Sequence, residues 1–94
     1  MNTSAIWHMY VVKCQDDSLY CGVTTCVERR LHEHNTSHRG AKYTRSRRPV
    51  VLVFDMICES RSAALKAEAA FKRMTRKQKL HMIHEYCAAL CAIP

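Results

Sequence analysis

A chain of 94 residues holds one domain with a single small core, without room for a second domain or a long linker. Its hydrophobic content of 48% argues against a disordered chain, and its longest apolar run is far too short to span a bilayer. The net charge of +7 favours a polyanionic partner over a membrane surface, and the start of the chain lacks the pattern of a signal peptide, which predicts a cytoplasmic protein.

The first predicted element is a β-hairpin. Residues 6–14 are rich in β-branched and aromatic types, residues 19–23 form a second such run, and a turn cluster lies between them. A three-residue loop at Asp16 to Ser18 would place Tyr10 and Tyr20 on one face of the hairpin. A four-residue loop would place them on opposite faces, and both registers stay open.

A helix is expected next. Thr25 fits a capping box with Glu28, so the helix should begin at Thr25 and end near Asn35. Arg30 and His34 are one turn apart and face the same way.

The segment 38–49 is basic and turn-like, with Gly40 as a flexible point and Pro49 as a stop. Residues 50–57 read as a third strand that is apolar enough to be central in its sheet.

Two helices complete the chain. Ser60 or Ser62 can cap the first, and a second capping box, Thr75 to Gln78, starts the last. The expected core-facing stripes are Ala64, Ala67, Phe71 and Met74, then Leu80, Ile83, Cys87 and Leu90. Glu68 flanks the first stripe. The order β-β-α-β-α-α predicts one α+β domain over residues 1–94, with its core at about 7–86.

The six cysteines favour packing over disulfides, because four lie in periodic apolar segments and no secretion signal is seen. Near the C-terminus, four possible zinc ligands follow one another at spacings of three, three and four: His81, His84, Cys87 and Cys91. They suggest a zinc-dependent interaction protein as a minor hypothesis. Structural zinc sites usually combine two separate segments, so packing is the favoured interpretation.

Basic residues are concentrated in two stretches. Residues 39–48 carry five basic and no acidic side chains, and residues 61–79 carry seven against Glu68 alone. Such blocks attract nucleic acid, whereas a merely solvated face usually mixes both signs. The predicted nucleic-acid contacts are Arg29, Arg39, Lys42, Arg45, Arg47, Arg48 and Lys72.

Five side chains could form a site for phosphodiester hydrolysis: Tyr10, Tyr20, Arg30, His34 and Glu68. This reaction requires an activated water, charge neutralisation on the phosphate and help for the leaving oxygen. Arg30 could clamp a phosphate, His34 could accept a proton near neutral pH, and Glu68 could hold one Mg²⁺-type ion. Each residue also has an ordinary structural interpretation, such as an ion pair between Glu68 and Lys72. Spacing alone does not choose between the two.

The whole pattern resembles the GIY-YIG nuclease domain. His8-Met9-Tyr10 stands at the first signature tripeptide and Tyr20-Cys21-Gly22 at the second. Residues 27–34 resemble the helix that bears the family's essential arginine, a role that falls on Arg30, and Glu68 matches the metal-binding glutamate. The resemblance covers roughly residues 7–86 and is closest to small, stand-alone bacterial members.

The resemblance implies a three-stranded antiparallel sheet flanked by helices, and a single Mg²⁺ or Mn²⁺ ion. In the implied mechanism Tyr10, Tyr20 or His34 prepares the water, and the identity of the base stays open. Arg30 stabilises the developing charge, and the ion held by Glu68 supports the leaving 3′ oxygen. Val23 and Thr24 stand where some members have a lysine, so a lysine-assisted tyrosine base is not expected unless Lys42 or Lys13 substitutes.

Residues 40–45, followed by Arg48-Pro49, also resemble the catalytic subunit of structure-specific nucleases that act on branched DNA. The expected function is therefore a metal-dependent endonuclease on DNA, specific for structure and not for sequence, in repair or recombination. Branched and single-stranded DNA are the expected partners, and RNA stays open. The alternative is a catalytically weak nucleic-acid-binding module that acts with a protein partner.

Overall fold

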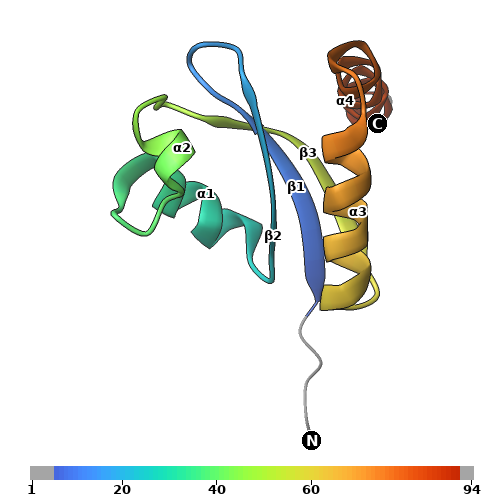
Figure 1. Ribbon diagram of the computed structural model, residues 1–94, viewed down its shortest axis with the longest axis horizontal. Helices are drawn as coiled ribbons and strands as arrows, with labels where there is room; N and C mark the ends of the chain where they lie inside the picture. The colour runs from blue at the N-terminus through green and yellow to red at the C-terminus, as the bar shows by residue number, and fades with distance from the viewer. Residues whose placement is uncertain (1–5, 92–94) are drawn as a thin grey trace, which may run out of the picture.

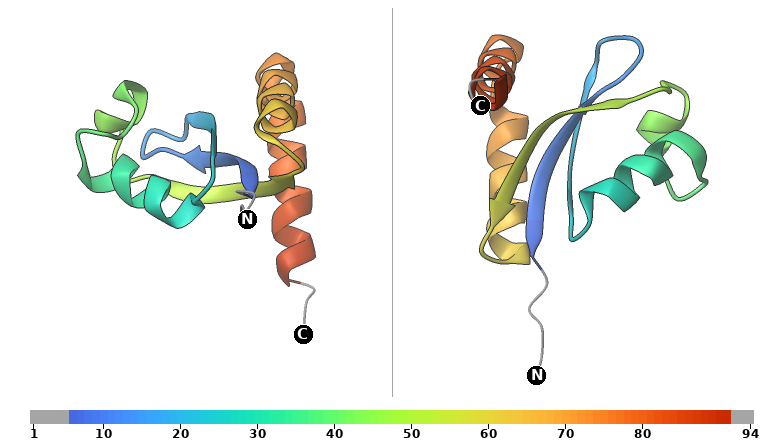
Figure 2. Two further views of the ribbon diagram at one scale, coloured as in Figure 1. Left: turned by 90° about the horizontal axis from the view of Figure 1, so that it is seen from below. Right: turned by 180° about the vertical axis from the view of Figure 1, so that it is seen from behind.

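The computed structural model describes residues 6–91. Three antiparallel strands, β1 (Trp7–Lys13), β2 (Leu19–Thr24) and β3 (Val51–Cys58), form one sheet in the order β2-β1-β3. Helices α1 (Val27–Thr36) and α2 (Lys42–Arg45) lie on one side of the sheet, and α3 (Arg61–Arg73) and α4 (Arg76–Cys91) lie on the other (Figures 1 and 2). The predicted fold class and element order are confirmed, with α2 as an addition.

The central strand is β1, so the prediction that the third strand is central was wrong. Side chains of β1 alternate between two cores: Met9 and Val11 pack toward α3, while Tyr10 and Val12 pack with residues of α1. By contrast, β3 lies at the sheet edge, where Ile57 keeps 71% of its surface exposed. A continuous apolar run in β3 is therefore not a sign of burial on both faces.

The hairpin register places both tyrosines on one face. Tyr10 lies opposite Gly22, and Val12 lies opposite Tyr20. The backbone N–H of Cys14 donates to Ser18 O at 2.8 Å, so the three-residue loop is residues 15–17, one residue earlier than expected. This shift moves every cross-strand partner by two positions and leaves the faces unchanged.

Helix starts follow the predicted capping in two cases out of three. Ser60 accepts from Ala63 N at 3.0 Å, and Thr75 and Gln78 exchange side-chain bonds to each other's backbone N–H. The capping box at Thr25 is wrong, because α1 begins after Cys26 with no side-chain cap. Instead the Thr24 hydroxyl accepts from Cys26 N at 3.2 Å, which ends β2 with a tight turn.

The last helix packs differently from its predicted stripe. Tyr86 contacts the Phe54 ring at 5.0 Å between centroids, and Met82 and Ile83 complete the packing against the core. Leu80, Cys87 and Leu90 are exposed. Cys87 and Leu90 belong to the C-terminal part of α4, which extends beyond the sheet (Figure 2). The packing interpretation of Cys87 was therefore wrong. No helix within residues 6–91 is long and apolar enough to cross a membrane.

All six cysteines are free thiols. Among residues 6–91, no three His, Cys, Asp or Glu side chains gather into a metal-binding group, and the zinc hypothesis gains no support from the C-terminal helix.

Candidate active site

A buried hydrogen bond joins β1 to α1 at the centre of the candidate site. Tyr10 Oη lies 2.7 Å from His34 Nε2, and the two side chains are 2% and 0% exposed. Gly22 makes the room for this contact, since a Cβ at that position would lie 2.6 Å from Tyr10 Oη. The glycine of the second tripeptide thus places the tyrosine of the first.

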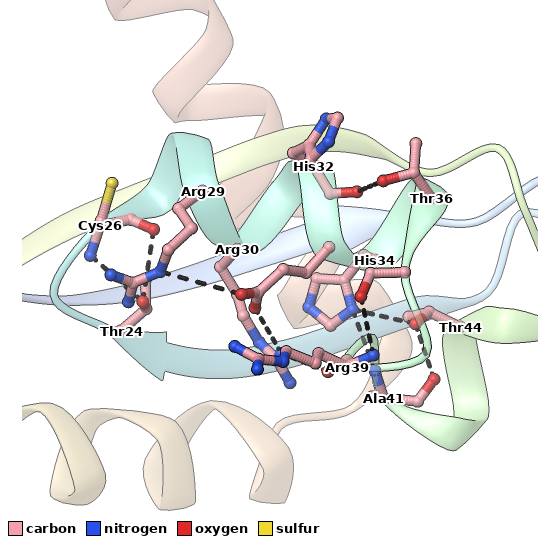
Figure 3. A network of polar contacts seen from close by, with 12 residues as sticks. Thr24, Cys26, Arg29, Arg30, His32, His34, Thr36, Arg39, Ala41 and Thr44 are labelled. Carbon is pink, nitrogen blue, oxygen red and sulfur yellow. Dashed lines mark hydrogen bonds and ion pairs between the residues drawn. The ribbon is translucent and has the colours of Figure 1, made fainter.

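Thr44 in α2 fixes the other side of the histidine ring (Figure 3). Its hydroxyl lies 2.9 Å from both His34 Nδ1 and Ala41 O. Because the hydroxyl has one hydrogen and Ala41 O can only accept, Thr44 donates to Ala41 O and accepts from His34 Nδ1–H. His34 Nε2 then accepts the Tyr10 proton, while Ala41 N stays 3.4 Å from Nδ1, a much weaker contact.

Burial keeps both groups neutral. Desolvation, aided by the charge of Arg30, lowers the pKa of His34 to about 4. Desolvation likewise raises the pKa of Tyr10 to about 12, although Arg30 acts in the opposite direction. At pH 7 the pair is a phenol bonded to an uncharged imidazole, and neither side chain is open to bulk solvent.

Arg30 lies beside this pair and is held from two sides. Its Nη1 donates to Glu33 Oε1 at 2.9 Å and to Arg39 O at 2.6 Å (Figure 3). The residues Glu33 and Tyr10 raise the pKa of Arg30, outweighing the opposite effect of its burial. A polar pocket of about 500 Å³ opens next to it, lined in part by Arg29, Arg39 and Trp7. An anion entering this pocket would meet three guanidinium groups and the Glu33 carboxylate, which pairs with two of them.

Tyr20 belongs to a second, more open group. Its ring meets the His34 ring edge-on at 5.2 Å and stacks with Tyr43 at 6.0 Å. The Arg47 guanidinium lies over the Tyr43 ring, 3.9 Å from its centroid. Tyr20 is half-buried, so of the two predicted tyrosines it is the one that solvent can reach.

Glu68 comes from α3, on the other side of the sheet from α1. Its carboxylate accepts from Lys72 Nζ at 3.0 Å and its side chain is 19% exposed. Burial raises the pKa of the Cys21 thiol to about 12, and the negative charge of Glu68 adds to that rise. Lys72, the partner of Glu68, lines a pocket with Cys21 of β2 at the outer edge of the sheet. Tyr20 lines the same pocket.

A single carboxylate suits a divalent ion that keeps most of its waters, because Mg²⁺ usually takes one or two protein carboxylates with substrate oxygens. Glu68 fits that requirement once Lys72 gives up its contact. The predicted site residues thus come from both faces of the sheet. Tyr10, Tyr20, Arg30 and His34 lie on one side, and Glu68 reaches the edge from the other.

The predicted nucleic-acid contacts fall into two groups. The first group is exposed and contains Arg29, Arg39, Lys42, Arg45 and Lys72. Within it, Arg29 lies 4.0 Å from Glu33 and Lys72 pairs with Glu68. Arg47 and Arg48 hold the fold together. Arg47 Nε donates to Asp16 Oδ2 at 3.1 Å, and Arg48 donates to the carbonyls of His34, Glu33 and Ser37 at the end of α1.

The sequence prediction missed Thr44. The four-residue helix that carries it is too short for a periodic pattern, and its stretch was expected to be a loop. A usable signal was the pair Ala41 and Thr44, spaced as in one helical turn, but nothing in the sequence linked that pair to His34.

Comparison with known proteins gives a consistent answer. A family model described as the GIY-YIG catalytic domain matches residues 6–81. A UPF0213 protein of Staphylococcus haemolyticus is 51% identical over 83% of this chain and 94% of its own length. A UPF0213 protein of Cupriavidus necator is 42% identical over 98% and 95%.

The solution structure of an Enterococcus faecalis protein is also similar, with 48% identity, a TM-score of 0.61 and coverage of 94% of this chain and 93% of that one. A UPF0213 protein of Bacillus halodurans, also solved in solution, has 37% identity, a TM-score of 0.55 and coverage of 84% and 83%. Together with the family match, these likenesses show that this chain belongs to the GIY-YIG catalytic domain family, which suggests a nuclease.

Proposed function

We propose that the protein is a metal-dependent endonuclease that hydrolyses phosphodiester bonds in DNA. The observation that carries the proposal is the buried Tyr10–His34–Thr44 network with Arg30 beside it. A core of this size gains nothing obvious from burying a histidine at 0% exposure, whereas a precisely held phenol next to an arginine suits phosphate chemistry.

Each side chain has a proposed role that follows from its position. Arg30 binds the phosphate and stabilises its developing charge, exchanging part of its contact with Glu33 for the substrate. Half-buried Tyr20 orients the attacking water, while His34 holds the buried Tyr10 phenol in place beside Arg30. Glu68 would hold one Mg²⁺ or Mn²⁺ ion, which supplies charge neutralisation at the leaving oxygen when bound.

DNA with a distinct structure, such as a branch, a flap or a single strand, is the proposed substrate. The assay must therefore compare cleavage of DNA with cleavage of RNA. The exposed cations around α1 and α2 suit a phosphate backbone, which every DNA sequence presents. The proposed setting is repair or recombination in the cytoplasm.

A second candidate is a binding module that becomes active only with a protein partner. Two contacts favour it: Arg30 is engaged by Glu33 and Arg39, and Glu68 is engaged by Lys72. Both would have to open before catalysis. This candidate predicts salt-sensitive DNA binding without cleavage by the isolated chain.

The test is incubation of purified protein with labelled duplex, single-stranded, flap and branched DNA and with matched RNA, in Mn²⁺ or in EDTA. We expect metal-dependent cuts that Arg30→Ala reduces by 10²-fold or more, as removal of one donor to a developing charge typically does. The His32→Gln variant changes an exposed residue of the same helix and should cleave DNA at the wild-type rate. Binding without cleavage of any substrate would favour the second candidate.

A further inference from the structure

We propose that a pocket at the outer edge of β2 binds one unpaired nucleobase of the substrate strand, next to the bond that is cut. The pocket has a volume of about 210 Å³ and is lined by Leu19, Tyr20, Cys21, Tyr43, Phe71, Lys72 and Lys79. The inference rests on the proposed nuclease function and deepens it by naming the feature that the substrate must have.

The lining matches the chemistry of a nucleotide. Most of its wall is aromatic or aliphatic, which suits the faces of a base, and two ammonium groups stand at its rim. Lys79 Nζ lies 5.4 Å from the centre of the Phe71 ring, so one cation is already placed over the apolar wall. Single-stranded nucleic acid is generally bound in this way, with aromatic side chains for bases and lysines for the backbone.

Contacts within the protein hold the aromatic wall in place. Tyr43 stacks with Tyr20 at an angle of 25° between the ring planes, and the Arg47 guanidinium lies over the Tyr43 ring. Arg47 is itself fixed by Asp16, at 3.1 Å, and by Tyr43 O, at 2.9 Å. An aromatic side chain that is already held by its neighbours loses little conformational entropy when a base packs against it.

The pocket lies between the two halves of the candidate active site. Its wall residue Tyr20 contacts the His34 ring, and its rim residue Lys72 contacts the Glu68 carboxylate. A strand whose phosphate lies between Arg30 and Glu68 would therefore place a neighbouring nucleotide at this pocket. The phosphate of that nucleotide can also draw Lys72 away from Glu68.

A base inside a duplex is stacked on both faces and cannot enter such a pocket without leaving its helix. The pocket therefore selects DNA with an unpaired nucleotide beside the cut, as in a single strand or a flap. Fully paired duplex DNA carries the added cost of unstacking one base and should be the poorest substrate.

The binding test uses single-stranded oligonucleotides that carry one 2-aminopurine, a base whose fluorescence falls when it stacks on an aromatic ring, in EDTA to prevent cleavage. We expect quenching at one position of the oligonucleotide. Tyr43→Ala should remove it and weaken binding roughly tenfold, the typical effect of losing one base-stacking side chain. Tyr43→Phe keeps the ring and should preserve both signals.

A control variant separates the effect of the two pocket lysines on binding from that of general positive charge. Lys72→Ala and Lys79→Ala should weaken binding, whereas Lys66→Ala, which removes an equal charge from an exposed position of α3 outside the pocket, should have a smaller effect. Equal losses in all three variants would mean that general charge attraction, and not the pocket, holds the strand.

The cleavage test places a single abasic site at successive positions of a cleavable strand. We expect cutting to fall about tenfold when the missing base is next to the scissile bond. Cleavage that is indifferent to every abasic position, with no quenching, would overturn the pocket and leave the nuclease intact. Quenching at one position without any cleavage would support the pocket and count against the nuclease.

Discussion

At the scale of single residues, the site depends on two neutral groups that share one proton. Thr44 leaves Nε2 of His34 free to accept from Tyr10, and burial keeps the histidine uncharged at pH 7. His34 is thus unsuited to take a proton directly from a bulk water, since its ring is fully buried. Among Tyr10, Tyr20 and His34, the half-buried Tyr20 is the group we propose to contact the attacking water.

The histidine makes stability depend on pH. An unfolded histidine has a pKa near 6.5, whereas that of His34 is lowered to about 4, so the unfolded chain binds the proton more readily between these values. The stabilising contribution is complete above pH 6.5 and is lost as pH falls toward 4, by about 3 kcal/mol at most. Urea unfolding at several pH values measures this loss.

His34→Gln should flatten that dependence between pH 6.5 and 4.5, while the exposed His32→Gln variant should keep it. An unchanged pH dependence in His34→Gln would show that another group causes the loss.

Gly22 links one residue to the geometry of the whole site. A methyl group at this position would lie within 2.8 Å of two atoms of the Tyr10 phenol, so the ring must move away from His34. We expect Gly22→Ala to lower the free energy of unfolding by about 1 to 3 kcal/mol, the usual cost of overpacking. Thermal unfolding measures the change, and a variant as stable as wild type would contradict this contact.

At the scale of elements, two similar sequence patterns have different outcomes. Thr25 and Thr75 each begin a predicted capping box, but only Thr75 caps its helix. Thr75→Ala should therefore cost about 1 kcal/mol of stability, whereas Thr25→Ala should change it by less than about 0.5 kcal/mol. Chemical denaturation of the two variants side by side checks this, and equal losses would show that Thr25 also caps α1.

Local sequence patterns predicted individual elements of the fold, but not how distant elements pack together. The two runs of β-branched and aromatic residues with a turn cluster between them were enough to place the hairpin, whereas its register stayed open between two loop lengths. The position of β3 in the sheet could not be predicted, since strand order depends on which face each helix covers. The stripe of α4 was wrong because only part of that helix meets the sheet.

The candidate site was predictable only in part. The sequence offered all five candidates, each with an ordinary structural interpretation, and the resemblance decided in favour of the catalytic one. The partnership of His34 with Thr44, and the approach of Glu68 to the edge of β2 from the opposite side of the sheet, arise from contacts between distant segments. Periodicity within one segment carries no information on such contacts.

At the scale of the whole molecule, the basic side chains differ in how freely they can contact DNA. Lys42 and Arg45 project into solvent from α2, whereas Arg48 is occupied by three carbonyls at the end of α1. We expect Lys42→Ala and Arg45→Ala each to reduce the slope of log affinity against log salt by roughly 0.7 to 0.9. Fluorescence anisotropy with labelled DNA measures this slope.

Arg48→Ala provides the comparison for that charge. It should leave the salt slope nearly unchanged and lower stability by about 1 to 2 kcal/mol, since its bonds are to the protein. A salt slope that falls as much in Arg48→Ala as in Lys42→Ala would show that Arg48 contacts DNA.

The most direct test of the nuclease account is single-turnover cleavage of the preferred DNA in Mn²⁺ by wild type, Glu68→Gln and Glu59→Gln. Glu68→Gln keeps the size of the side chain and removes the charge that would hold the ion, while Glu59 is an exposed carboxylate next to the start of α3 and serves as the control. The account predicts wild-type rates for Glu59→Gln and a loss of at least 10²-fold for Glu68→Gln. Equal rates for all three proteins would contradict it.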